Sequence, residues 1–185
     1  MFIKKLPVSC DISAVKKDLD WILTQTNWDH TNQVGLTHRQ GAIDPWMDSV
    51  GSLFKDYTAD NRPKECDFNV WNNLVPEYTT KQLELLKKNQ GCNFGRIRFM
   101  RLLPRRGLSV HKDLEPRFHL VLKTNPHAFF GQKYESRKID CVLPITSITY
   151  HIPADGHWYE IDTRQTHYVY NGGEEERIHL VVCKL

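Results

Sequence analysis

The sequence lacks the features that mark disulfide-rich, zinc-binding and membrane-spanning proteins. Its five cysteines are scattered, odd in number and without a C-x-x-C pair. That pattern argues against a disulfide framework or a zinc knuckle and favours a reducing compartment. No apolar run approaches membrane-spanning length, and the first residues lack the apolar core of a signal peptide. We therefore expect a cytoplasmic protein with no membrane partner.

Neither sign of charge dominates, because the formal net charge is only +3. The total charge therefore indicates no strong partner preference. One stretch of the chain is nevertheless rich in arginine, at Arg96, Arg98, Arg101, Arg105 and Arg106. Two interpretations stay open for this stretch: a solvated strand and turn, or a positive approach to a site that takes an anion.

The first ninety residues have a mixed, partly helical pattern. Apolar residues at helical spacing predict one helix over 13–23, with Ser13 as a possible N-cap, and a second over 80–88 that ends before Gly91. Alternation predicts a short strand over 33–39. A chain of 185 residues fits one domain. We expect residues 1–90 to support the rest of that domain.

From residue 91 the pattern changes to short strands separated by turn residues. We predict strands over 95–103, 157–161 and 177–183, with at most a short strand at 127–130 and a β-rich segment at 141–150. The Asn171-Gly172-Gly173 sequence is a strong hairpin signal. The expected fold is mainly β with flanking helices, and residues 91–185 form an antiparallel barrel or jelly roll.

The stretch 109–122 combines a His-x-Asp pair with an Arg-x-His pair. Residues two apart in a strand share a face, so His111 lies with Asp113, and Arg117 with His119. Two histidines and one carboxylate form the ligand set of non-haem Fe(II) oxygenases. A His-x-Asp pair alone is weak evidence in a chain with nine histidines. His167 is the best candidate for the third ligand, because it stands between a strand and the final hairpin.

The Arg117-Phe-His119-Leu-Val-Leu sequence has an echo in Arg177-Ile-His179-Leu-Val-Val. In each run the Arg and His share one face, and the aliphatic residues share the other. If the aliphatic faces pack outward, both Arg-His pairs face the barrel interior. A buried guanidinium needs an anion, and a dicarboxylate co-substrate suits its forked geometry. The alternative is ion pairing of these arginines with Glu115, Glu160 or Glu174–Glu176.

Together these motifs resemble the aspartyl/asparaginyl β-hydroxylase-like group of Fe(II)/2-oxoglutarate dioxygenases, which includes bacterial free-proline hydroxylases. The resemblance runs from about Gly95 to Leu185. It is carried by His111-Lys-Asp113, by the two Arg-x-His runs, and by Trp158-Tyr-Glu-Ile-Asp162 leading to His167.

The resemblance implies a double-stranded β-helix, a cupin-like jelly roll, that uses Fe(II), 2-oxoglutarate and O2. It places the metal on His111, Asp113 and His167. It places Arg177 at the far carboxylate of 2-oxoglutarate, with Arg117 and His119 contacting the co-substrate near the metal. Asp162 matches a family aspartate, which we expect either to form a turn or to hold a metal ligand in orientation.

One departure bears on the substrate. Animal aspartyl/asparaginyl hydroxylases have Gly where this chain has Asp113, so the sequence looks more like the proline-hydroxylating branch. The implied activity is hydroxylation of a C–H bond in an amino acid, or in an amino-acid side chain of a peptide or protein, producing succinate and CO2.

Two other functions are alternatives. An oxygenase acting on nucleic acid is suggested by the arginine-rich stretch, although no aromatic residues interleave with it as a basic stripe. A non-catalytic cupin-like binding module would keep the fold, but it has no need of two histidines, a carboxylate and the arginines together.

Overall fold

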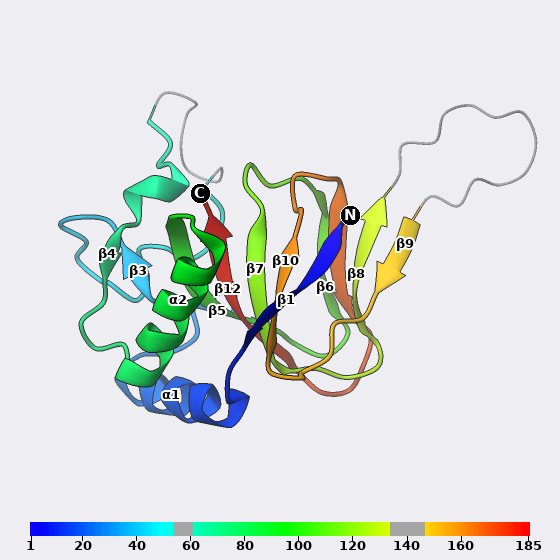
Figure 1. Cartoon of the computed structure of the whole chain (residues 1–185), viewed down its shortest axis with the longest axis horizontal. Helices are drawn as coiled ribbons and strands as arrows, with labels where there is room; N and C mark the ends of the chain where they lie inside the picture. Colours follow the sequence, from blue (N-terminus) through cyan, green and yellow to red (C-terminus); the bar gives the residue numbers. More distant parts are fainter. Residues whose placement is uncertain (54–60, 134–146) are drawn as a thin grey trace, which may run out of the picture.

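The computed structural model describes residues 1–53, 61–133 and 147–185, which form three layers. Figure 1 shows two helices on one side of a large sheet and a smaller sheet on its other side. The large sheet has the antiparallel order β1-β10-β7-β12-β5-β2, and the small one the antiparallel order β6-β11-β8-β9. Two opposed antiparallel sheets with two helices confirm the predicted mainly β fold.

The strands of the large sheet are β1 (Ile3–Ser9), β2 (Gln33–Gly35), β5 (Phe94–Leu102), β7 (Arg117–Lys123), β10 (His157–Ile161) and β12 (Arg177–Lys184). Those of the small sheet are β6 (Arg106–His111), β8 (Ala128–Lys133), β9 (Ser147–Tyr150) and β11 (His167–Asn171). A separate pair joins β3 (Thr37–His38) to β4 (Val70–Trp71), and a 3-10 turn, η1, covers Glu65–Asp67. The first ninety residues thus supply two strands, β1 and β2, to the large sheet.

Both helices lie where apolar spacing predicts them. The first, α1, covers Ile12–Gln25, but its N-cap is Asp11 rather than Ser13, because the Asp11 carboxylate accepts a 2.8 Å hydrogen bond from the Ser13 amide. The second, α2, covers Glu77–Gln90 and ends at Gly91, whose φ of 61° suits glycine. No helix among the residues described is long and apolar enough to span a membrane.

Alternation along the large sheet divides its side chains between two cores. Phe118, Leu120, Leu180 and Val182 point outward and join the buried faces of both helices in the larger core. The opposite faces meet the small sheet, where a second core contains Val121, Phe130, Tyr159, Ile161 and Val169. The aliphatic faces of the two echoed runs therefore pack outward as predicted, and the side chains between them point into the barrel.

The predicted hairpin at Asn171-Gly172-Gly173 is wrong. Strand β11 belongs to the small sheet and β12 to the large one, so this turn carries the chain between sheets. Asn171 is fully buried, and its side-chain amide donates to the carbonyls of Leu102 and Glu175 at 3.1 and 2.8 Å. The asparagine thus holds a crossover, and the glycines mark a turn without strand pairing across it.

Two further strand predictions differ from the structure in length. Strand β8 covers Ala128–Lys133, so it begins near the predicted position but runs three residues past the predicted end. In the predicted β-rich segment 141–150, β9 covers Ser147–Tyr150, and residues 141–146 lie outside the described part of the chain.

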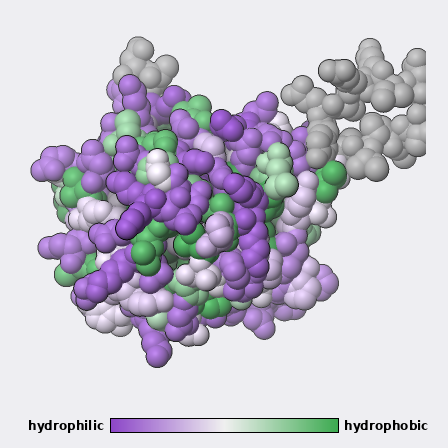
Figure 2. Space-filling model, viewed as in Figure 1, coloured by the Kyte–Doolittle hydropathy of each residue, from purple (hydrophilic) through white to green (hydrophobic). Residues whose placement is uncertain are grey.

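Hydrophilic side chains cover most of the face seen in Figure 2, with hydrophobic ones scattered between them. Large apolar residues are concentrated instead in the two cores. Stability should therefore depend mainly on packing between the layers.

Replacing Leu180 with Ala should test the layer between the large sheet and the helices. Leu180 is 0% exposed in the larger core, so removing its side-chain carbons should lower the free energy of unfolding by about 2–5 kcal/mol. Leu85→Ala, at a 54% exposed position of α2, is the control and should change it by less than about 0.5 kcal/mol. Urea denaturation measures both, and equal losses would contradict this account of the core.

Candidate metal centre

Strand pairing places the two predicted histidine ligands directly opposite each other on neighbouring strands. His111 is the last residue of β6 and His167 the first of β11, and the register of these antiparallel strands pairs them directly. Their ring centroids are 4.3 Å apart. Strand pairing thus brings together two residues that lie 56 positions apart in the sequence.

Asp113 reaches the same point from just beyond the strand. Because β6 ends at His111, strand alternation does not place this carboxylate, contrary to our expectation. The Asp113 amide instead donates a 2.9 Å hydrogen bond to the Thr163 carbonyl, and the Thr163 hydroxyl donates to the Glu115 carbonyl at 2.7 Å. Two bonds therefore tie the segment after β6 to the turn before β11.

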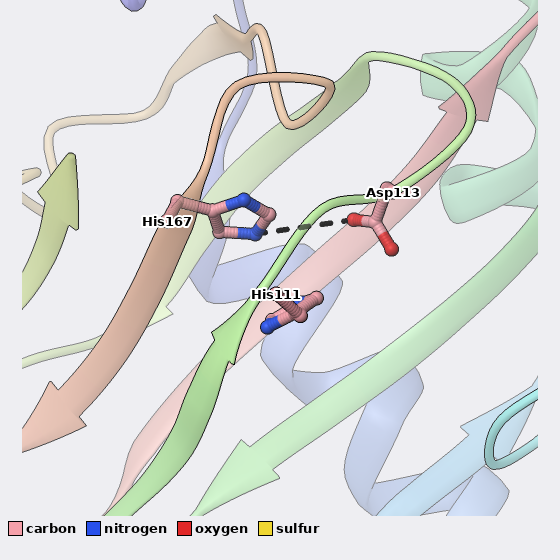
Figure 3. A group of neighbouring side chains, drawn as sticks. All are labelled: His111, Asp113 and His167. Carbon is pink, nitrogen blue, oxygen red and sulfur yellow. Dashed lines mark ion pairs between the residues drawn. The ribbon is translucent and has the colours of Figure 1, made fainter. Parts of the chain in front are cut away.

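The three predicted ligands converge, as Figure 3 shows. One ligand atom from each of His111, Asp113 and His167 lies within 4.8 Å of the others, and the His167 Nε2 to Asp113 Oδ2 distance is 4.0 Å. Small side-chain rotations would let one ion contact all three. Two imidazoles and one carboxylate, with the other coordination positions left to outside ligands, are the donor set that suits non-haem Fe(II).

Both histidines are oriented by backbone carbonyls. His111 Nδ1 lies 2.6 Å from the Ser109 carbonyl oxygen, and His167 Nδ1 lies 2.9 Å from that of Gln165. A carbonyl only accepts, so each Nδ1 carries the proton and each Nε2 keeps its lone pair for a metal. Burial, with the nearby His111, lowers the pKa of His167 even though the Gln165 carbonyl opposes this. His167 is therefore neutral at pH 7, as a metal ligand must be.

Asp162 shapes the turn that carries Gln165. Its carboxylate accepts hydrogen bonds from Arg164 Nε at 2.6 Å and from Gln165 Nε2 at 3.0 Å, and its backbone carbonyl accepts from the Gln165 amide at 3.1 Å. Because the Gln165 carbonyl orients His167, Asp162 acts on the site through this turn. These contacts match the turn-forming role expected of it.

Arg117 holds the carboxylate of the centre. Its Nε donates to Asp113 Oδ2 at 2.8 Å, and its Nη2 lies 3.5 Å from Glu65 Oε1. Burial acts to raise the pKa of Asp113, but the charge and hydrogen bond of Arg117, together with both histidines, outweigh burial and lower it. Asp113 is thus ionised and oriented. None of the glutamates proposed as alternative partners pairs with Arg117 among the described residues.

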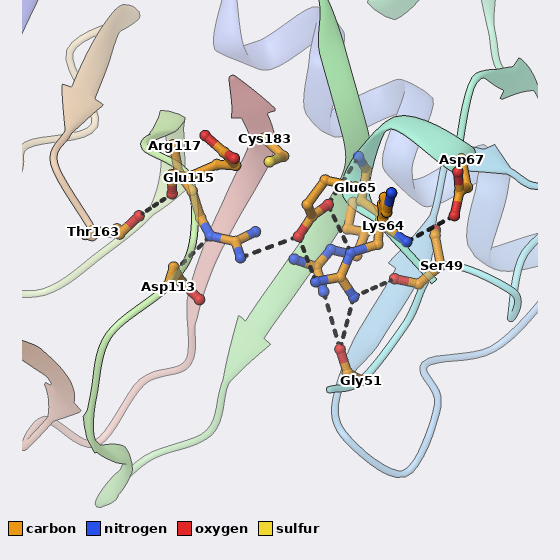
Figure 4. A network of polar contacts seen from close by, with 12 residues as sticks. Ser49, Gly51, Lys64, Glu65, Asp67, Asp113, Glu115, Arg117, Thr163 and Cys183 are labelled. Carbon is orange, nitrogen blue, oxygen red and sulfur yellow. Dashed lines mark hydrogen bonds and ion pairs between the residues drawn. The ribbon is translucent and has the colours of Figure 1, made fainter. Parts of the chain in front are cut away.

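Glu65 is a residue of this network that the sequence did not reveal. It lies in η1, far from the barrel in sequence, and accepts from Arg96 Nε at 2.9 Å and Nη2 at 2.8 Å. Figure 4 shows its carboxylate facing Arg117. Gly95 permits the contact, since a Cβ there would lie 2.8 Å from the Glu65 carbonyl oxygen. Burial acts to raise the pKa of Glu65, but the hydrogen bonds and charges of the surrounding arginines lower it to about 2.

The two interpretations of the arginine-rich stretch each hold for part of it. Arg105 and Arg106 are exposed, as in the solvated interpretation. Arg96 and Arg98 are 4% and 3% exposed and point into the barrel, so they are unable to contact a nucleic-acid backbone. Two of the five arginines that suggested the nucleic-acid alternative are therefore excluded from such an interface.

Arg177 lies deep in the barrel without a carboxylate partner among the described residues. Its guanidinium stacks on Phe130 at 4.8 Å from the ring centroid, and its Nη2 lies 3.2 Å from His179 Nδ1. Burial lowers the pKa of Arg177 to about 9. An unpaired buried guanidinium is costly, so this position favours an anionic ligand.

His119 and His179 form a neutral pair beside Arg177. Their Nδ1 atoms are 3.2 Å apart, and burial followed by the charge of Arg177 lowers the pKa of each. Since Arg177 only donates, His179 Nδ1 is the acceptor and His119 Nδ1 carries a proton. Both Nε2 atoms are buried with no partner among the described residues, which leaves His179 Nε2–H as a donor and His119 Nε2 as an acceptor.

Replacing Glu65 with Gln should destabilise the protein strongly. The variant leaves Arg96 buried without a carboxylate, and breaking a buried pair in this way costs about 3–5 kcal/mol. Urea denaturation at pH 7 measures the loss. Glu77→Gln is the matched control, because Glu77 forms an exposed pair with Lys81 and its loss should leave the midpoint unchanged. Equal midpoints for the two variants would contradict the structural role of Glu65.

The pH dependence of the free energy of unfolding should also distinguish Glu65→Gln from the unsubstituted protein. The pKa of Glu65 is about 2 when folded against an ordinary 4.5, so its stabilisation is present above pH 4.5 and is lost as pH falls towards 2. Glu65→Gln should therefore lose less stability across this range than the unsubstituted protein does.

Comparison with known proteins agrees with this geometry. The sequence profile of the family described as Aspartyl/Asparaginyl beta-hydroxylase matches residues 11–183. No curated protein matches the chain. Among solved structures, AviO1 from Streptomyces viridochromogenes Tue57 is similar at TM-score 0.55 and 12% identity, over 99% of this chain and 89% of that one. The viral collagen prolyl hydroxylase of Paramecium Bursaria Chlorella virus-1 is similar at 0.51 and 11%, over 100% and 89%.

Proposed function

Because the chain belongs to the aspartyl/asparaginyl beta-hydroxylase family, we propose that it hydroxylates a C–H bond of an amino acid, free or within a peptide. The family and the His111, Asp113 and His167 triad together make it an Fe(II)/2-oxoglutarate-dependent dioxygenase. One observation carries the proposal: two histidines with free Nε2 atoms and an ionised carboxylate meet at the end of a strand pair.

In this proposal the three ligand residues hold Fe(II), and their carbonyl and arginine partners keep them in orientation. When bound, Fe(II) and 2-oxoglutarate supply the oxidation of the substrate by O2, with release of succinate and CO2. The chain's own task is to position the reacting groups and to exclude water. The core between the two sheets supports the second task, because it packs apolar side chains against the inner face of the large sheet.

Arg177 is proposed to bind the far carboxylate of 2-oxoglutarate. It is buried, it has no carboxylate partner among the described residues, and a co-substrate dianion would compensate its charge. His179 Nε2–H is a second donor there, and His119 can donate to the co-substrate only from the opposite tautomer. Arg117 Nη1 has no hydrogen-bond partner among the described residues while its Nε holds Asp113, so Arg117 retains a donor for the co-substrate near the metal.

The finer parts of the proposal concern substrate and domain. The carboxylate at Asp113 favours the proline-hydroxylating pattern over the animal aspartyl/asparaginyl pattern, in which Gly takes that position. A collagen prolyl hydroxylase among similar structures is consistent with a prolyl substrate, although 11% identity supports only the shared fold. We also propose that residues 1–185 act as one catalytic domain, because Glu65 and β1 belong to the same interior as the triad.

Replacing His167 with Ala should abolish iron binding and succinate formation together. The variant removes one of the three ligand groups. Iron retained after gel filtration and succinate formed from 2-oxoglutarate are the two measurements. His127→Ala, at an exposed turn position just before β8 and outside the centre, is the matched control and should retain both. Full activity in His167→Ala would refute the metal assignment.

Replacing Arg177 with Gln should raise the KM for 2-oxoglutarate by about 100-fold or more, since a charge-assisted bidentate contact is lost. Iron retention should stay unchanged, because within the described residues Arg177 contacts His179 and Phe130 and not the three metal ligands. Initial rates of succinate formation across 2-oxoglutarate concentrations give this KM. An unchanged KM would show that Arg177 has another partner.

A further inference from the structure

The inner face of the large sheet carries more positive charge than its carboxylates compensate. Four buried guanidiniums, those of Arg96, Arg98, Arg117 and Arg177, belong to strands β5, β7 and β12. The acidic partners they have among the described residues are Glu65 and Asp113. Fe(II) and a 2-oxoglutarate dianion carry opposite charges of equal size, so their binding leaves the excess unchanged.

Arg98 is the member of this group for which neither the described residues nor the proposed co-substrate supplies an anionic partner. Arg96 pairs with Glu65, Arg117 with Asp113, and Arg177 is assigned to 2-oxoglutarate. Arg98 Nη1 donates to the neutral side-chain oxygen of Gln33 at 2.8 Å and lies 3.4 Å from the Gly51 carbonyl oxygen. Its Nε is buried without a partner among the described residues. Burial and the neighbouring Arg96 and Arg117 lower its pKa well below the ordinary value.

Strand register places Arg98 beside the centre. Arg98 pairs with Val181 of β12, and Val181 pairs with His119 of β7, so the three lie in one row across the inner face. Neighbouring strands are about 4.8 Å apart, which puts the backbones at Arg98 and His119 roughly 10 Å apart. Arg117 is the next inward-facing residue along β7 from His119, and it holds Asp113. An anion at Arg98 is therefore within the span of one small molecule from the metal ligands.

We propose that Arg98 binds a carboxylate of the substrate, so that the enzyme selects a substrate with an acidic group held one small-molecule length from the metal. This inference rests on the proposed hydroxylase function. The carboxylate has two sources, the α-carboxylate of a free amino acid or the side chain of an aspartyl residue. Neutral peptidyl prolyl and asparaginyl groups do not supply it.

The first test is the stability of the ligand-free protein. A guanidinium kept buried for a ligand lacks full compensation when the ligand is absent, so Arg98→Gln should melt at or above the temperature of the unsubstituted protein. The matched control is Arg101→Gln on the same strand, where Arg101 bonds Asn32 and stacks on Trp28. A large drop in Tm for Arg98→Gln beyond that of the control would make Arg98 a structural residue and overturn the proposal.

The second test compares acids with their amides on the iron-loaded protein with 2-oxoglutarate. The probes are L-proline, L-aspartate and L-asparagine, each as free acid and C-terminal amide, with N-acetyl-aspartyl amide carrying only the side-chain carboxylate. Thermal shift reports binding, and succinate with a one-oxygen mass gain reports hydroxylation. At least one probe with a carboxylate should stabilise the unsubstituted protein and be turned over, and the probe with an amide in place of that same carboxylate should be at least tenfold weaker.

Arg98→Gln should raise the KM for that acid by tenfold or more and leave the KM for 2-oxoglutarate and the iron content unchanged. Equal use of every carboxylate probe and the probe with an amide in place of that carboxylate, or equal KM values in the variant, would overturn the inference while leaving the hydroxylase function intact. Acid-dependent stabilisation that disappears in Arg98→Gln, with no succinate from any probe, would retain the anion site and count against the proposed function. If no probe stabilises the unsubstituted protein more than Arg98→Gln, the inference fails.

Discussion

The antiparallel pairing of β6 with β11 is the constraint on which the centre depends. It sets His111 directly opposite His167, and no side-chain contact is needed to bring them together. A shift of one residue in this register would turn one imidazole to the opposite face of the sheet. The hydrogen bond from the Asp113 amide to the Thr163 carbonyl then places Asp113 against this pair. The carbonyls of Ser109 and Gln165 fix the tautomers of both histidines. Backbone geometry thus determines the donor set before any metal is bound.

A second constraint is the compensation of buried charge. The inner face of the large sheet holds guanidiniums, which would be unfavourable in an apolar core without an anionic partner. Glu65 makes part of this arrangement stable by pairing with Arg96 and approaching Arg117, which in turn orients Asp113. The remaining excess lies on Arg98 and Arg177, where ligands are expected to enter. Stability and ligand selection are therefore properties of the same few side chains.

Much of this could be predicted from the sequence, because the informative residues follow the two-residue period of a strand. Residue spacing predicted the two helices and which side chains of 117–122 and 177–182 share a face. Spacing and the family resemblance together predicted that His111, Asp113 and His167 converge. Glu65 could not be predicted, since it lies in a short 3-10 turn with no periodic pattern and meets β5 only because Gly95 lacks a side chain. The Asn171-Gly172-Gly173 turn misled for a related reason: local turn chemistry does not specify which sheet the next strand joins.

The origin of Glu65 outside the strand-rich half has a consequence for dissecting this protein. Residues 91–185 contain every residue proposed to bind iron or the co-substrate, so a fragment of these residues is the obvious choice for a minimal enzyme. Cutting there would remove β1 from the edge of β10 and leave both Arg96 and Arg117 without the carboxylate from η1. The exposed strand edge and the unpaired charges would favour aggregation over folding. The catalytic half is thus complete in its chemistry but depends on the N-terminal half for its physical integrity.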